Sequence, residues 1–262
     1  MNILAKTGDF AIAKWRNVRN TVSVAWGVLC LAVSPKSWPR TVREQVAKQL
    51  LFTGVEAIGL TTVIAVLAGI SIVVQAQLWL NRFGQSEVLG PLLVAIIIRE
   101  VAPMLVNFVV IGRSGTAIAT ELANMRVRHE VDVLDAQGIE PTLYLIMPRV
   151  IGMIASVFCL TVIFVTVCFG SGYLFGLLIG VAAGDPVVFL RSVLGAVSPA
   201  DIVNLFAKTL VPGLVTGTIC SMEGLSIGGT VTEVPQAVTR AVVRSIVALL
   251  VVSVAISIVT YL

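Results

Sequence analysis

The longest charge-free run in the chain covers residues 150–184, and it restricts the fold more than any other feature. Its thirty-five residues include no Asp, Glu, Lys or Arg. A helix of about 20 apolar residues crosses a bilayer, so this run belongs in a membrane and exceeds one crossing. Barrel strands would instead appear as alternating segments of about ten residues, and the sequence lacks them. We therefore predict a long, tilted membrane helix over residues 143–184, with a short outer segment at its end.

The composition of the whole chain supports an all-α integral membrane protein. It is 57% hydrophobic and 12% charged, with a mean hydropathy of +1.00. A soluble domain carries roughly 25% charged residues. The four cysteines all lie in apolar stretches and form no CxxC pair, and the single His129 excludes HExxH and multi-histidine sites. We expect no metal site.

Residues 1–54 are predicted to form cytoplasmic or interfacial helices ahead of a transmembrane domain at residues 55–262. The first twenty residues are polar and basic, and the apolar residues 21–33 are too few to span. We expect them to form a helix partly sunk in the membrane rather than a cleaved signal peptide. After Pro39, an apolar residue recurs every fourth position, which is typical of an amphipathic interfacial helix. These residues are Val42, Val46 and Leu50.

About five membrane spans are expected. They cover residues 57–80, 88–111, 143–184, 202–220 and 237–262. An outer polar excursion is predicted at about residues 183–201. Within the third span, Gly172, Gly176 and Gly180 recur every fourth residue, and such a stripe allows close helix approach. This approach could occur within one protomer or between two.

The basic residues predict the orientation of these spans. Fourteen Lys and Arg residues flank the spans on the side of the N-terminus, whereas only Arg82 and Arg191 lie on the other side. Positive charge stays on the cytoplasmic side. We therefore place the N-terminus in the cytoplasm and the C-terminus outside.

The sequence contains no recognisable catalytic motif. It has no GxxxxGK[ST] phosphate loop and no GxSxG elbow, and with one histidine in the chain no Ser/His/Asp set is plausible. We predict a non-catalytic membrane subunit without a cofactor of its own. Energy for any uphill transport would then come from a partner that binds ATP or from an ion gradient.

A polar stretch over residues 112–141 separates the second and third spans, and its arm, about residues 113–141, is the candidate socket for a partner. Mixed charges of this density suit the docking of a soluble protein. The alternative is a solvated loop whose charges only keep it out of the membrane. The candidate docking residues are Glu121, Met125, Arg126, Arg128, Glu130, Asp132 and Asp135, with His129 among them.

Charged residues also interrupt the spans. Arg99 and Glu100 lie in the second span near Pro103, which should bend it, and Lys208 lies in the fourth. Intramembrane charges are costly and usually mark a substrate path. We predict that Arg99 and Glu100 bind substrate, with Arg99 facing a lipid phosphate or an acid on another helix and Glu100 facing Lys208. The alternative is pairing that only fixes helix packing.

Two residues could anchor the arm to the membrane domain. Arg113 and Glu121 are eight residues apart and would share one face of a continuous helix, although Gly112 and Gly115 could break it. Ordinary snorkelling of Arg113 to the interface is the alternative.

Several ordered motifs resemble the MlaE/YrbE permease family over nearly the whole chain from about residue 40. They are REVAP at residues 99–103, GRSGTAIATEL at 112–122, MPRV at 147–150 and EGLSIGGTVTEVPQAVTRAVVRSIV at 223–247. Members of this family are membrane subunits of ABC transporters that work with MCE-domain proteins. One departure is that Asp132, Val133 and Leu134 stand where the family often has Asp-Ala-Leu.

The resemblance implies a homodimeric permease in the inner membrane. Two cytoplasmic ATPase subunits would bind the arm as a coupling helix, and a periplasmic MCE-domain protein would receive or deliver phospholipid. The rival functions are an ion-gradient-driven secondary transporter or channel and a non-transporting scaffold. Few buried carboxylates and no evident inverted repeat disfavour the secondary transporter. Nothing in the sequence suggests nucleic acid as a partner.

Overall fold

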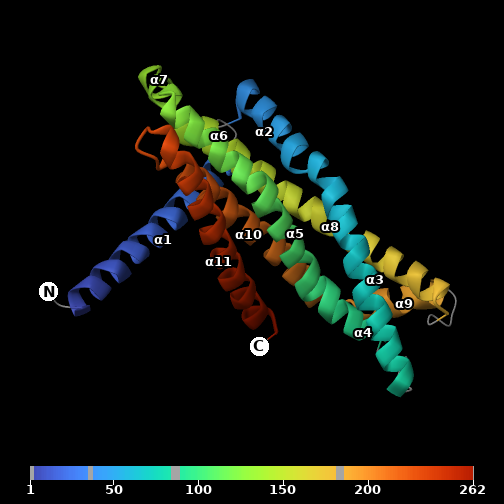
Figure 1. The fold of residues 1–262 in the computed structure, drawn as a ribbon. Helices are drawn as coiled ribbons and strands as arrows, with labels where there is room; N and C mark the ends of the chain where they lie inside the picture. Colours follow the sequence, from blue (N-terminus) through green and yellow to red (C-terminus); the bar gives the residue numbers. More distant parts are fainter. Residues whose placement is uncertain (1–2, 35–37, 84–88, 181–185, 262) are drawn as a thin grey trace.

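The structure is a computed structural model that describes residues 3–34, 38–83, 89–180 and 186–261. In these ranges the chain forms helices and no strand, and five helical stretches are long and apolar enough to cross a membrane. The protein is therefore an all-α, multi-pass membrane protein, as the sequence predicts. Figure 1 shows the long helices crossing one another in a slanted bundle, from which α1 projects.

The N-terminal helix α1 (Ile3–Val33) is continuous, so the basic lead and the short apolar segment belong to one helix of 31 residues. Its C-terminal end is attached to the bundle. Val28 is buried in a cluster with Met147 and Val150, and Trp38 Nε1 donates a hydrogen bond of 2.9 Å to the carbonyl of Ala32. The N-terminal end projects away from the other helices (Figure 1).

The predicted amphipathic helix is α2 (Arg40–Thr53), and Val42 and Val46 lie on its buried face. A single 3₁₀ turn at Val55–Ala57 joins α2 to α3 (Ile58–Phe83), so Arg40–Leu80 forms one helical stretch. α2 packs closely on α8, because Gly152 of α8 presents bare backbone to the side chain of Gln49. An interfacial position for α2 stays a prediction.

The second span covers Leu89–Val127 and is longer than the predicted 88–111. Neither Gly112 nor Gly115 breaks it, so the first half of the arm is the end of this span. The chain turns only at His129, which has a left-handed φ of 58°. The successive segments are α4 (Leu89–Leu93), a π-helix at Val94–Val101, α5 (Ala102–Val110), a π-helix at Ile111–Gly115, α6 (Thr116–Val127) and, beyond the turn, α7 (Glu130–Ala136).

The third span consists of a π-helical turn at Thr142–Ile146 and α8 (Met147–Leu178). The helix ends just before Gly180, whose φ of 74° favours glycine. Gly172 packs within the protomer, since a Cβ atom there would lie 2.6 Å from the carbonyl oxygen of Gly69 on α3. The predicted continuation to residue 184 falls partly on residues 181–185, which lie outside the described ranges.

Most of the predicted outer excursion is a helix, α9 (Pro186–Ala196). Val193 is buried in the main core, and the ring of Phe189 stacks on Tyr173 of α8 at 4.9 Å. The structure differs here from a polar loop because the segment's inner residues are mostly apolar. The fourth and fifth spans are α10 (Pro199–Leu225) and α11 (Val234–Tyr261), joined by a turn with a 3₁₀ segment at Val231–Glu233.

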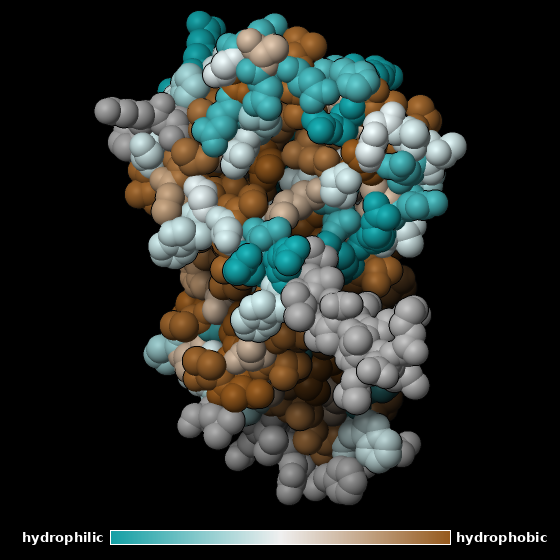
Figure 2. Space-filling view, turned by 90° about the vertical axis from the view of Figure 1, so that its left-hand side faces the viewer, coloured by the Kyte–Doolittle hydropathy of each residue, from teal (hydrophilic) through white to brown (hydrophobic). Residues whose placement is uncertain are grey.

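Surface polarity is divided along the bundle. On the face from which α1 projects, hydrophilic residues concentrate in the upper half, toward the end that carries α7, and hydrophobic residues dominate the lower half (Figure 2). This division suits a chain with one solvated end and a body in lipid.

Candidate functional site

A proline in the second span frees a carbonyl inside the bundle. Pro103 has no N–H to bond the carbonyl of Arg99, four residues earlier, and it follows the π-helix at Val94–Val101. Two side chains of α10 fill this gap. Lys208 Nζ donates to the Arg99 carbonyl at 2.9 Å, and Asn204 Nδ2 donates at 3.3 Å.

A second proline creates the same situation on α10. Pro212 lies inside this helix and leaves the carbonyl of Lys208 without its usual donor. Asn107 of α5 donates to that carbonyl from Nδ2 at 3.3 Å and to the Pro103 carbonyl at 2.8 Å. Each helix therefore supplies the hydrogen bond that the other has lost, which aligns the charged side chains between them.

Two ion pairs connect the second span to α10. Lys208 Nζ lies 2.7 Å from Glu100 Oε1, which also accepts a hydrogen bond of 2.9 Å from Ser257 of α11. Arg99 Nε lies 2.7 Å from Asp201 Oδ1. The predictions that Glu100 pairs with Lys208 and that Arg99 can face an acid on another helix are confirmed.

Asp201 is held by more than Arg99. It receives hydrogen bonds of 2.9 Å from the backbone N–H and the hydroxyl of Ser198 and one of 2.8 Å from the hydroxyl of Tyr261. Ser198 and Asp201 form the capping box of α10. The guanidinium of Arg99 also lies 4.6 Å from the centre of the Tyr261 ring, a cation–π distance.

These four charges, Arg99, Glu100, Asp201 and Lys208, are called the membrane charge network below. Its two α10 members are buried, with side-chain exposures of 1% for Lys208 and 0% for Asp201. Its two second-span members are partly exposed, with side-chain exposures of 50% for Glu100 and 32% for Arg99. A half-exposed carboxylate at hydrocarbon depth costs several kcal/mol unless its surroundings are polar. An anion could reach Arg99 from this side, and a substrate role for Arg99 and Glu100 stays a prediction.

Sequence reasoning missed several members of this site. Asp201 was assigned to the outer excursion, although the Ser198-Pro199-x-Asp201 pattern is a helix-start signal. Asn107 follows Pro103 by four residues, a spacing that places its amide next to the weakened turn. We find no local signal that would have selected Tyr261 or Ser257.

A second group of ion pairs attaches the arm to the membrane helices. Arg113 donates to Glu56 at 2.6 Å and to the Phe52 carbonyl at 2.9 Å. Glu121 of α6 lies 2.9 Å from Arg149 of α8. Arg113 and Glu121 therefore both anchor the arm, as predicted, but through different partners.

The tip of the arm carries exposed pairs. Asp132 lies 2.6 Å from Arg126 and 2.9 Å from His129 Nδ1. The hydrogen bond from His129, together with the charge of Arg126, lowers the pKa of Asp132 below its ordinary value. Arg128 and Glu130 approach within 3.9 Å.

The remaining predicted docking residues divide into two kinds. Met125 is half-buried and packs against Leu122 and Val131, so it belongs to the apolar core that joins α6 to α7. Asp135 is exposed on α7 together with Val133. The tip therefore presents mixed charge and some apolar surface to solvent.

The turn between α10 and α11 lies against the arm. Ile227, Val234 and Ala237 form a buried cluster with Ala123 of α6. Glu223 pairs with both Arg240 and Arg244 across the hairpin. In the turn, Glu233 accepts a 2.7 Å hydrogen bond from Gly228 N–H. Sequence reasoning placed this turn on the cytoplasmic side but did not join it to the arm.

The sequence profile of the MlaE permease family matches residues 46–259, which contain both the membrane charge network and the arm. The chain belongs to the MlaE permease family. It is similar to a probable ABC transporter permease protein of Rickettsia prowazekii, with 29% identity over 209 residues that make up 80% of each chain. A probable ABC transporter permease protein of Synechocystis sp. is 29% identical over 204 residues, 76% of this chain and 75% of the relative.

The chain also resembles a plant protein. The chloroplastic protein TRIGALACTOSYLDIACYLGLYCEROL 1 of Arabidopsis thaliana is 29% identical over 228 residues, which cover 86% of this chain and 62% of the plant chain. As an MlaE permease, the chain is the membrane-spanning part of a transporter. Among the described residues no group of three or more His, Cys, Asp or Glu side chains is placed to hold a metal ion.

Proposed function

We propose that this permease is the membrane subunit of an ABC transporter that moves lipid, with phospholipid as the substrate class. The observation that carries the proposal is the half-open membrane charge network. Lys208 and Asp201 are buried and fix the geometry, while Arg99 and Glu100 are partly exposed at the depth of the spans. A guanidinium in this position can bind a phosphate headgroup while the surrounding apolar helices accommodate acyl chains. The name of the plant relative, which refers to a glycerolipid, agrees with a lipid substrate.

The energy comes from separate ATPase subunits that bind the arm in the cytoplasm, so this chain needs no cofactor of its own. Two features support this role: the exposed charges on α7, and the attachment of α6 to α8 through the Glu121–Arg149 ion pair. A push on α7 would pass to α6, which is continuous with the second span and hence with Arg99.

The permease works as a homodimer in the inner membrane, with its N-terminus in the cytoplasm. The C-terminus and α9 face the periplasm, where an MCE-domain protein exchanges lipid with it. The distribution of basic residues supports this orientation. A second copy beside α11 would also shield the exposed side of Glu100 from lipid tails, since α11 is the least buried of the five spans.

The test is co-purification followed by reconstitution. We expect a tightly held ATPase and lipid transfer that stops when the ATP site of that subunit is blocked. Transfer that follows a proton gradient without any ATPase would instead identify a secondary transporter. An assembly that binds partners but transfers no lipid would identify a scaffold. Either result would contradict the proposal.

A further inference from the structure

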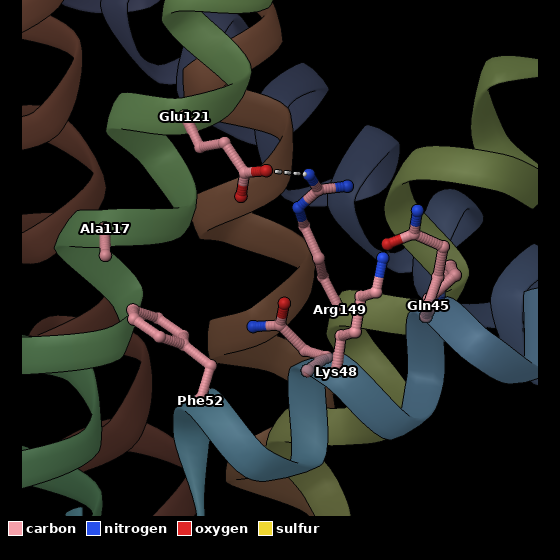
Figure 3. A pocket seen from close by; sticks show the side chains of 8 residues that line it. Gln45, Lys48, Phe52, Ala117, Glu121 and Arg149 are labelled. Carbon is pink, nitrogen blue, oxygen red and sulfur yellow. Dashed lines mark ion pairs between the residues drawn. The ribbon is translucent and has the colours of Figure 1, made fainter. Parts of the chain in front are cut away.

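A cavity of about 420 Å³ opens between α2, α6 and α8, far along the second span from the membrane charge network. Figure 3 shows side chains from three helices converging on it: Lys48 and Gln45 from α2, Glu121 from α6 and Arg149 from α8. Phe52 forms an apolar part of the wall.

The cavity has more hydrogen-bond donors than acceptors to satisfy them. Arg149 is 9% exposed, and its Nε atom is buried without an acceptor. Its two terminal nitrogens are already used, one by Glu121 at 2.9 Å and one by the Leu145 carbonyl at 2.7 Å. Within the described residues, the head groups of Lys48 and Gln45 have no hydrogen-bond or ion-pair partner.

The charge balance of the cavity favours an anion. Lys48 and Arg149 contribute two positive charges, and among the described residues that line the wall Glu121 is the only acid. A buried guanidinium with N–H groups left unbonded is costly, and an anionic oxygen in the cavity beside it would offset that cost. A phosphate group presents several acceptor oxygens at once, so it could bind Arg149 and Lys48 together.

The position of the cavity indicates where such a phosphate comes from. It lies where the amphipathic α2 passes into α3, close to Arg113, whose guanidinium is 5.3 Å from the centre of the Phe52 ring. Amphipathic helices with basic residues lie at the headgroup level of a bilayer. We propose that this cavity binds the phosphate of an anionic membrane lipid between Lys48 and Arg149, with its glycerol region against Phe52.

This site is separate from the proposed transport site and does not depend on it. A lipid held here would bridge α2, α8 and the anchored part of the arm, because Glu121 and Arg149 are already paired across α6 and α8. Occupancy would therefore stiffen the attachment of the arm, whichever substrate the permease carries.

The test is native mass spectrometry of the purified full chain with dioctanoyl phosphatidylglycerol. Inorganic phosphate is the free-anion probe, and dioctanoylglycerol is the uncharged lipid probe. Lys48→Gln should weaken binding of the phosphatidylglycerol about tenfold, the effect of one charge-assisted hydrogen bond. Arg43→Gln removes an exposed charge from the same helix outside the cavity and should leave binding unchanged.

Two further variants keep the result clear. The double variant E121Q/R149Q removes the cation without leaving an unpaired acid, and it should also lose the lipid while eluting as a folded protein. Repeating the Lys48→Gln comparison in an Arg99→Ala background removes any contribution of the membrane charge network, and the Lys48-dependent binding should persist there.

Equal weakening by Lys48→Gln and Arg43→Gln would show only general surface attraction and would overturn the proposal. Equally tight binding of inorganic phosphate would overturn its lipid part. If dioctanoylglycerol binds as tightly as dioctanoyl phosphatidylglycerol does, the phosphate does not contribute to binding and the proposal is wrong.

Discussion

The membrane charge network and the tip of the arm have similar charged residues but very different surroundings. In the network, Lys208 and Asp201 are almost wholly buried and their pairs are reinforced by hydrogen bonds. At the tip, the side chain of Asp132 is 51% exposed, and those of its partners Arg126 and His129 are 38% and 75% exposed. Removing one member of a buried pair costs about 3–5 kcal/mol, whereas an exposed pair contributes about 0–1 kcal/mol. The network therefore holds the fold together, and the tip is free to serve a partner.

The largest effect is expected at Lys208. Lys208→Met should destabilise the protein by about 3–5 kcal/mol, since it removes the ion-pair partner of Glu100 and the shorter of the two side-chain hydrogen bonds to the Arg99 carbonyl. Thermal unfolding in detergent measures this loss. Arg43→Met is the matched control on an exposed surface and should leave the midpoint nearly unchanged. Equal midpoints for both variants would contradict the comparison.

The next effect concerns transport more than folding. Arg99→Ala should reduce lipid transfer at least about tenfold, because one charge-assisted contact to a phosphate is lost. Asp201 keeps its bonds to Ser198 and Tyr261, so the assembly should still form. Arg191→Ala on α9 is the control. Unchanged lipid occupancy and transfer in Arg99→Ala would show that the network only fixes helix packing.

At the tip, charge reversal should affect binding but not stability. Glu130→Lys together with Asp132→Lys should release the ATPase in a pull-down experiment, while the unfolding midpoint shifts little. Glu44→Lys, exposed on α2, gives the same kind of charge change away from the arm and should retain the ATPase. If the arm variant still retains the ATPase, the arm is only a solvated loop and not the docking site.

The smallest effect is a pH dependence at the tip. The hydrogen bond from His129 and the charge of Arg126 lower the pKa of Asp132 below its ordinary value. Such a depressed pKa stabilises the arm at pH values above the ordinary pKa of an aspartate. This contribution to stability is lost as the pH falls through the lowered pKa of Asp132. The protection of the α7 amides, which is the intrinsic exchange rate at each pH divided by the measured rate, should therefore be constant at neutral pH and fall below about pH 4. Asp132→Asn should remove this acid-dependent step, and the same step in the variant would contradict the assignment.

The sequence predicted the parts of the molecule that depend on local composition. Long apolar runs located the spans, and the spacing of Val42 and Val46 located α2. It also paired Glu100 with Lys208, because a membrane interior contains few charges from which to choose. It could not predict that the second span continues through Gly112 and Gly115, since glycine is tolerated where neighbouring helices pack closely.

Other features depend on contacts between distant segments. The reciprocal bonding of the Arg99 and Lys208 carbonyls arises only when the turns that precede Pro103 and Pro212 lie side by side on two helices. Tyr261 reaches Asp201 from the far end of the chain. Such contacts bring together residues tens of positions apart, and no local pattern records them.

Site-specific photo-cross-linking tests the division of labour between the two regions most directly. A photoreactive residue replaces exposed Val133 on α7 in one variant and exposed Ile258, next to Ser257, in another. We predict that the Val133 probe captures a nucleotide-hydrolysing subunit and the Ile258 probe captures phospholipid. A Val133 probe that captures no such subunit, or an Ile258 probe that captures no lipid, would contradict the account.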